Sequence, residues 1–308
     1  MWENIVTVGG QVLILFFLMA VGFACGKLKF FTGSGVASIT DLLLYIVTPC
    51  VIIHSYQREF NAEMLNGFLV AFASAVGVHV LNVLFCYLLI RDRDKARERV
   101  MRFATIFTNC GYMSIPLQQA VLGSDGVFYG SAYIAVFNLI FWSYGVFLMS
   151  GDKKTLSAKR MILNPGVIPV VVGFLLFVFS VRLPSLLNTT IESIAALNTP
   201  LPMFIVGYYL SNVRFREYSI SGKVCWATAL RLFLLPFIAL GAMFFCGVRG
   251  TVLVTNTIAA AAPAAAGTTM FALKFHQDTE LSAQMVSITT LGAIVSMPLV
   301  VGVAQFLA

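Results

Sequence analysis

The sequence predicts an all-α polytopic membrane protein whose ten transmembrane helices form two inverted five-helix repeats. Three observations predict this fold: apolar runs long enough to cross a membrane, basic residues gathered in alternate loops, and short motifs that recur at a nearly fixed spacing. The composition agrees, because 59% of the 308 residues are hydrophobic and only 11% are charged. A soluble domain carries about 25% charged residues, so the composition excludes a soluble fold.

The apolar runs define the predicted spans. Each run is about 18–25 residues long, the length that an α-helix needs to cross about 30 Å of hydrocarbon. The first run has neither a basic segment before it nor a small-residue cleavage site after it, so we expect a retained span rather than a signal peptide. The ten spans are predicted at residues 8–26, 36–56, 65–90, 102–122, 127–149, 163–181, 186–211, 221–247, 250–273 and 281–307.

Lysine and arginine residues set the predicted orientation. Most of the 20 basic residues lie in alternate loops, beginning with the loop after the first span. They are Lys27, Lys29, Arg91, Arg93, Lys95, Arg97, Arg99, Arg102, Lys153, Lys154, Lys159, Arg160, Arg214, Arg216, Lys223 and Lys274. Because basic loops stay on the cytoplasmic side, we expect a multi-pass protein of the cell (plasma or inner) membrane with both termini extracytoplasmic. Topology thus explains the net charge of +7 better than a nucleic-acid partner does.

Short motifs of the first half recur in the second half. Thr48-Pro49 matches Thr199-Pro200 at an offset of 151 residues, and Thr108-Asn109 matches Thr255-Asn256 at an offset of 147. We therefore expect one five-helix repeat in residues 1–150 and another in residues 151–308. Since five is an odd number, the second half enters the membrane from the opposite side. Inverted repeats of this kind support alternating access in many secondary transporters.

The fourth and ninth spans contain the predicted substrate site. Each combines small polar residues with a proline, which removes a backbone donor and interrupts the helix. In hydrocarbon such an interruption survives only where it is buried in protein or lines a wet cavity. The start of each half-helix then carries partial positive charge and favours an anion, especially a carboxylate; a simple kink without a ligand is the alternative. The predicted substrate-binding residues are Asn109, Gly111, Ser114, Pro116, Asn256, Pro263, Gly267 and Thr268.

Five further residues are candidates for coupling or gating: Asp41, Pro49, Glu192, Pro200 and Arg231. An ionisable side chain inside a span indicates a proton relay or a cation ligand, although both carboxylates lie near span starts and can reach the interface. The two prolines either unwind the second and seventh spans or only kink them. Arg231 either attracts an anionic substrate or pairs with a carboxylate or with free carbonyl groups.

The sequence predicts no metal centre, no cofactor and no enzyme. The six cysteines lie inside or at the edge of apolar runs without a CxxC pair, and the three histidines are scattered. Such cysteines are typical of packing rather than of a disulfide or metal framework. The chain also contains no GxSxG, HExxH or phosphate-loop motif.

Three motifs give the chain a resemblance to the auxin efflux carrier family, which includes bacterial malonate and malate carriers. They are Gly22-x-x-x-Gly26-Lys27-Leu28 followed by 43–49, Asn109-x-Gly111-Tyr112-x-x-Ile115-Pro116-Leu117, and Ala262-Pro263-Ala264. The resemblance covers essentially the whole chain. It implies a scaffold domain and a crossover transport domain related to the bile-acid/sodium symporter superfamily. It also implies that Asn109, Pro116 and Pro263 lie at the crossing, with Asn256 close by. Where plant members carry a second proline, this chain has 266–269, Ala-Gly-Thr-Thr.

The expected function is secondary transport of a small organic anion by an elevator-like or rocking movement of the crossing helices. The alternatives are a carrier coupled to Na⁺ or H⁺ through Asp41 or Glu192, and a non-transporting membrane sensor. The expected partners are a small carboxylate substrate and the lipid bilayer, and a homodimer is compatible with an elevator scaffold. The substrate, the direction of transport and the driving ion stay open.

Overall fold

The computed structural model describes residues 2–157, 159, 163–212 and 221–308. Within these ranges the regular structure is helical, and the single exception is one isolated β-bridge between Thr108 and Ala264. The all-α prediction is therefore confirmed for the described part of the chain. Three of the basic residues used for the predicted orientation, Arg160, Arg214 and Arg216, lie outside these ranges.

The helical elements follow one another as short and long segments, several of them joined end to end through π-helical or 3₁₀ turns. The α-helices are α1 (Trp2–Lys27), α2 (Gly33–Leu42), α3 (Thr48–Ser55), α4 (Ala62–Leu89), α5 (Lys95–Ile106), α6 (Ile115–Ile140), α7 (Val146–Ser150), α9 (Ile168–Val178), α10 (Ser185–Ala195), α11 (Pro200–Ser211), α12 (Gly222–Ala229), α13 (Leu235–Phe245), α14 (Gly250–Ala261), α15 (Gly267–Lys274) and α16 (Thr279–Leu307). The π-helical turns are η1 (Leu43–Val47), η2 (Cys110–Ser114), η3 (Phe141–Gly145) and η7 (Leu230–Leu234), and the 3₁₀ turns are η4 (Lys153–Thr155) and η5 (Ala196–Asn198).

Seven helical runs among the described residues are long and apolar enough to cross a membrane. They are Val8–Lys27, Gly33–Ser55, Ala62–Leu89, Cys110–Ser150, Ser185–Ser211, Gly222–Phe245 and Thr279–Leu307. Two shorter apolar helices, Ile168–Val178 and Gly250–Ala261, lie within predicted spans 163–181 and 250–273. The predicted spans 102–122 and 127–149 largely share one 41-residue run, Cys110–Ser150, so the chain must turn inside it.

Gly123 makes that turn. Its backbone is non-helical, with φ 64° and ψ −151°, a conformation that glycine adopts without a steric penalty. Beyond it the chain packs back on Gln118: a Cβ on Gly126 would lie 2.7 Å from the Gln118 backbone oxygen, and one on Gly130 would overlap the Gln118 amide. The 41-residue run is therefore two helices that reverse direction at Gly123.

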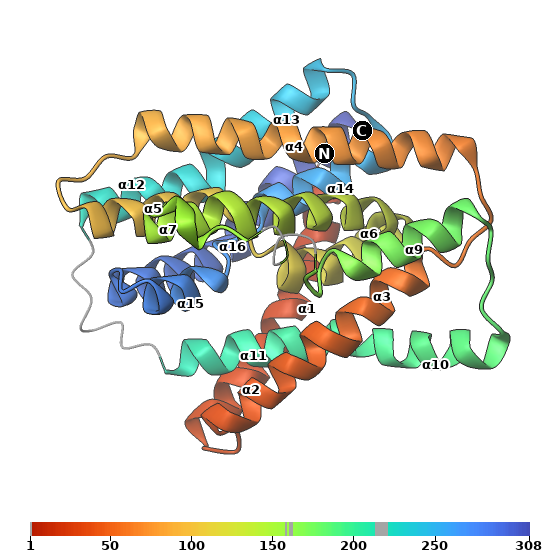
Figure 1. Cartoon of the computed structure of the whole chain (residues 1–308), viewed down its shortest axis with the longest axis horizontal. Coiled ribbons are helices and arrows are strands. Elements are labelled where there is room, and N and C mark those ends of the chain that lie inside the picture. Colours follow the sequence, from red (N-terminus) through yellow and green to blue (C-terminus); the bar gives the residue numbers. More distant parts are fainter. Residues whose placement is uncertain (1, 158, 160–162, 213–220) are drawn as a thin grey trace.

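Glycines also allow α1 to approach α11 closely. A Cβ on Gly22 would overlap the backbone of Phe204, one on Gly207 would overlap the Met19 carbonyl oxygen, and one on Gly26 would overlap the Ser211 hydroxyl. Small residues four positions apart on both helices thus meet face to face, the arrangement that lets membrane helices gain packing energy without a hydrophobic driving force. Figure 1 shows α1 passing behind α11, with α10 and α11 following one another along one edge.

Pro49 and Pro200 lie in the first turns of α3 and α11, directly after η1 and η5. A proline in a first helical turn costs no intrahelical hydrogen bond. The second and seventh predicted spans therefore continue through their prolines as joined helices, Gly33–Ser55 and Ser185–Ser211. α3 packs against α9 and α10.

Ion pairs join the α4–α5 connection and the first turn of α5 to the starts of α12 and α16. Lys223 Nζ lies 3.0 Å from Asp92 Oδ2, and Arg97 Nη1 lies 3.2 Å from Asp278 Oδ2. Asp278 also caps α16, because its Oδ1 accepts from the Leu281 N–H at 2.8 Å. The Asp94 backbone N–H and the Lys223 ammonium hold the pKa of Asp92 below its ordinary value. The loops thus fix the ends of helices that come from both halves of the chain.

We predict that Gly207→Ala lowers the stability of the protein by about 1–3 kcal/mol, because the added methyl group overlaps the Met19 backbone in a contact that cannot relax cheaply. Thermal unfolding of the purified protein in detergent measures the effect. Gly10→Ala is the matched control, since a Cβ there meets no atom within 4 Å. Equal melting temperatures for the two variants would contradict the close α1–α11 contact.

Candidate functional site

Two interrupted helices meet at the centre of the candidate site. α5 ends at Ile106 and α14 ends at Ala261, and the non-helical segments that follow them, 107–109 and 262–266, run antiparallel. The Asn109 N–H donates to the Pro263 carbonyl oxygen at 2.8 Å, and the Ala265 N–H donates to the Phe107 carbonyl oxygen at 2.9 Å. We call these two paired segments the helix junction.

The two interruptions have different causes, one local and one tertiary. Ala262 has an extended backbone (φ −61°, ψ 150°), which is the conformation that a following proline imposes. No proline lies in 107–109; Phe107 is extended (φ −95°, ψ 120°), and pairing with the other segment satisfies its carbonyl group. Pro116, from which we expected the first interruption, lies seven residues later in the first turn of α6, where a proline costs little.

Arg231 bridges the C-terminal ends of both interrupted helices. Its Nη1–H donates to the Thr105 carbonyl oxygen of α5 at 2.9 Å, and its Nη2–H donates to the Ala260 carbonyl oxygen of α14. The side chain is fully buried in η7, and no carboxylate among the described residues pairs with it. Of the roles that the sequence left open for Arg231, the structure therefore shows the binding of free carbonyl groups. Asn82 of α4 adds a longer contact of 3.5 Å to the Ile106 carbonyl oxygen.

Thr289 of α16 completes the junction and was not predicted. Its Oγ1 accepts from the Ala264 N–H at 3.1 Å and donates to the Met285 carbonyl oxygen at 2.7 Å. Without Thr289, the Ala264 N–H would be buried without an acceptor. The sequence held a signal in the polar residues Ser287, Thr289 and Thr290 within an otherwise apolar span.

Asn109 offers a free amide at the junction. Only 7% of the residue is exposed, and its side chain forms no hydrogen bond with the described residues. Two positions further on, a Cβ on Gly111 would meet no atom within 4 Å, so there is space beside this part of η2. Thr268, at the start of α15, is fully buried and its hydroxyl has no partner in the described structure. These groups lie at the N-terminal ends of the helices that leave the junction.

Other polar residues of the fourth and ninth spans tie these helices to each other or to α4. Ser114 Oγ–H donates weakly to the Ile258 carbonyl oxygen at 3.5 Å, and the unpredicted Gln118 donates from Nε2 to Thr255 O at 3.1 Å. Asn256 lies in α14, about 9 Å along the helix before the junction. It is fully buried, and its Nδ2–H donates to the Ala71 carbonyl oxygen of α4 at 2.9 Å.

Gly267 belongs to an aromatic cluster beside the junction. A Cβ on Gly267 would lie 2.5 Å from the ring of Phe141, which stacks on Phe271 at a centroid distance of 4.7 Å. Phe107 packs edge-on against the same Phe141 ring at 5.3 Å. The glycine therefore lets α15 start directly against the rings that cover the junction.

The two candidate coupling carboxylates lie elsewhere. Asp41 in α2 and Glu192 in α10 are both exposed, and neither forms an ion pair with the described residues. Neither side chain hydrogen-bonds to the helix junction. The structure thus brings together Asn109, Pro263, Thr268 and Arg231. Neither carboxylate binds to them, but Asp41 lies near enough to η2 for its charge to act on Tyr112.

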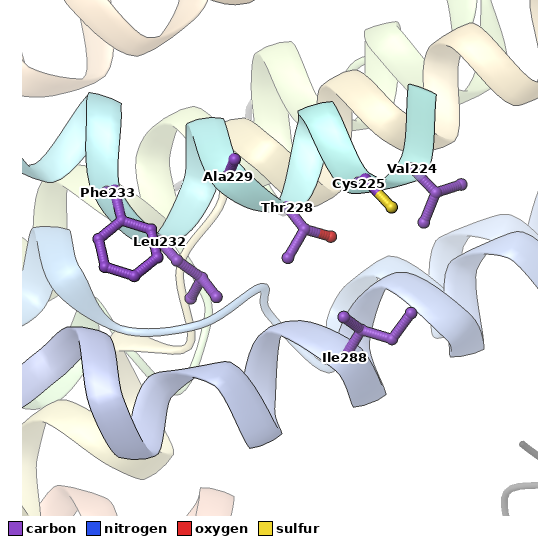
Figure 2. A pocket seen from close by; sticks show the side chains of 7 residues that line it. All are labelled: Val224, Cys225, Thr228, Ala229, Leu232, Phe233 and Ile288. Carbon is purple, nitrogen blue, oxygen red and sulfur yellow. The ribbon is translucent and has the colours of Figure 1, made fainter. Parts of the chain in front are cut away.

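A surface groove of about 300 Å³ lies between α12–η7 and α16. Figure 2 shows the side chains that line it, with the Thr228 hydroxyl and the Cys225 sulfur among apolar groups. The lining residues are Val224, Cys225, Thr228, Ala229, Leu232, Phe233 and Ile288. The groove holds no charged side chain and no residue of the helix junction, so it does not suit a carboxylate.

Comparison with known proteins gives the class of the chain. The model of the "Membrane transport protein" family matches residues 7–159 and 153–301. The chain is 22% identical to an uncharacterized transporter of Methanothermobacter thermautotrophicus over 94% of this chain and 95% of the relative. It is 23% identical to the uncharacterized transporter YfdV of Escherichia coli K12 over 97% of this chain and 98% of the relative. With its apolar helices, the chain is a multi-pass membrane protein of the transporter class. It belongs to this membrane transport protein family, the auxin efflux carrier family, so the resemblance drawn from the motifs is confirmed.

We predict that Thr289→Val lowers the stability by about 1–3 kcal/mol, because the buried Ala264 N–H loses its acceptor while the side-chain volume stays nearly constant. Thr290→Val is the matched control: Thr290 is 1% exposed, and its side chain forms no hydrogen bond with the described residues. Thermal unfolding of both purified variants decides the question. If Thr290→Val is as destabilised as Thr289→Val, the hydroxyl of Thr289 does not hold the junction.

Proposed function

We propose that this protein is a secondary transporter that carries a small organic anion, a mono- or dicarboxylate of the malonate, malate or auxin kind, by alternating access. The family and the relatives establish a membrane transporter. The proposal adds the anion, the site at the helix junction and an elevator-type movement.

The free Asn109 amide is the observation that carries the proposal. The residue is 7% exposed, its side chain has no hydrogen-bond partner among the described residues, and it lies where two interrupted helices are joined through their backbones. An amide N–H can donate to a carboxylate oxygen, and no side chain fills the space within 4 Å of a Cβ placed on Gly111. A bound carboxylate would therefore satisfy the polar group that the protein leaves unsatisfied.

The charges around the junction favour a negative ligand on the side of Asn109. Two helical segments begin there: the segment formed by η2 and α6, and the helix α15. Helix N-termini carry partial positive charge and unpaired N–H groups. The opposite, negative ends of α5 and α14 are already bound by Arg231. The helix starts thus contribute a positive potential that suits a carboxylate, while Asp41 adds a negative charge that acts on Tyr112 of η2.

We propose that ten spans form two inverted repeats, residues 1–150 and 151–308, with the helix junction as their crossing. The junction pairs one interrupted helix from each half. The packing of α11 with α1 and α2, and of α3 with α9 and α10, supports a scaffold part. The packing of α14 with α6, α13 and α16 supports a transport part around the junction.

Alternating access fits the burial of the site. Asn256 and Thr268 are fully buried and Asn109 is 7% exposed, so a substrate that contacts all three would need the helices to move. The proposed movement carries the junction as one unit against the scaffold part. The proposed orientation has both termini outside the cell membrane, as the basic loops indicate.

We predict that Asn109→Ala lowers the uptake of labelled malonate, malate or indole-3-acetate into proteoliposomes by about tenfold or more, because the ligand loses a hydrogen bond to a charged oxygen. The loss appears in the substrate that the wild-type protein transports best, at equal reconstituted protein. Asn138→Ala serves as the control, since the Asn138 amide donates only within its own helix, to the Ile134 carbonyl oxygen at 2.9 Å.

Two outcomes would count against the proposal. Unchanged flux in Asn109→Ala would remove the junction amide from the substrate site. Binding of a carboxylate without any flux in the wild-type protein would favour a sensor on the same fold instead of a carrier.

A further inference from the structure

We propose that Arg231 is a built-in cation of the helix junction, which occupies the place of a coupling metal ion and makes transport independent of sodium. The flux part of this inference rests on the proposed function; the binding part does not. In broken-helix transporters, unwound carbonyl groups and half-helix C-termini are the groups that coordinate Na⁺. In this chain the Arg231 guanidinium binds such groups itself.

The amount of charge supports this assignment. Each helix C-terminus carries roughly half a negative elementary charge, so two ends that face one point present about one negative charge. One guanidinium contributes one positive charge. α5 and α14 both direct a carbonyl group near their ends, Thr105 and Ala260, at Arg231. A single monovalent cation therefore balances the two ends, and the protein supplies it covalently.

The surroundings of Arg231 supply no other counter-charge. The titratable groups that face it, Cys86, Cys110, Tyr133 and His79, come from α4, η2 and α6, and none of them is a carboxyl. A buried charge without compensation is strongly destabilising. Within the described structure, the carbonyl groups of the two interrupted helices therefore compensate the positive charge of Arg231. Arg231 in turn compensates the partial negative charge of those helix ends.

The shape of the guanidinium explains why arginine suits this position. Its planar fork donates two N–H groups in fixed directions, so one side chain can hold carbonyl groups from two helices of opposite halves. A lysine ammonium carries the same charge but concentrates it on one nitrogen and lacks the planar fork. Arg231 therefore positions the junction as well as neutralising it, whereas Asn82 reaches only the helix of its own half, at Ile106.

The test removes the cation and replaces it with a free one. In Arg231→Ala, we expect the apparent melting temperature in detergent to fall and to recover with millimolar guanidinium chloride, which fits the vacated space, but not with tetramethylammonium chloride. Anion flux in proteoliposomes should fall about tenfold or more and show the same pattern of rescue. Wild-type flux should be equal in sodium, potassium and choline media.

Arg249→Ala is the matched control. Arg249 also donates to backbone carbonyl groups at a helix end, those of Phe244 and Val248, but it is exposed. Its alanine variant should show no stabilisation by guanidinium. Arg231→Lys, which keeps the charge, should stay independent of sodium and be less stable than the wild type.

The outcomes separate this inference from the proposed function. A wild-type flux that requires sodium would overturn the inference, as would an Arg231→Ala variant whose stability does not respond to guanidinium. If the wild type shows no anion flux at all, the proposed function fails, while the stability measurements on Arg231→Ala still decide whether a cation is built into the junction. A variant too unstable to purify leaves Arg231→Lys and the sodium dependence of the wild type as the deciding measurements.

Discussion

Two backbone hydrogen bonds, between Asn109 and Pro263 and between Ala265 and Phe107, are the contacts on which the rest of this structure depends. An interrupted helix exposes polar backbone groups, and hydrocarbon offers them no partner. Each interrupted segment therefore needs another segment at the same depth. The pairing satisfies both at once, so each interrupted segment supplies hydrogen-bond partners that the other needs.

The neighbouring helices complete this accounting of polar groups. Thr289 accepts from the Ala264 N–H, Arg231 and Asn82 bind carbonyl groups at the helix ends, and Gln118 ties α6 to α14. These side chains come from separate elements of both halves, so several independent contacts hold the junction in one position. Helices such as α1 and α11 need no polar partners, and they approach through glycines instead.

The class of the protein could be predicted from the sequence because hydrophobic length and motif order are local properties. The all-helical chain, its apolar helices and its family follow directly from them. The first interruption was misplaced toward Pro116, because its cause is a tertiary contact with 263–265 and not a local breaker. Thr289 was missed for the same reason, and for Arg231 the sequence left free carbonyl groups as only one of several roles, because a polar side chain in a span indicates a partner but not which one.

Asn109 and Arg231 show how one junction can hold both signs of charge without cancelling its function. The C-terminal ends of α5 and α14 meet a permanent cation, while the helix starts after the junction keep their partial positive charge beside an unpartnered amide. If the negative ends were left bare, a mobile cation would be needed each time an anion is bound. In the proposed movement Arg231 would travel with its helices, so the proposed anion site would stay positive in every position of the transport part and would need no second solute to prepare it.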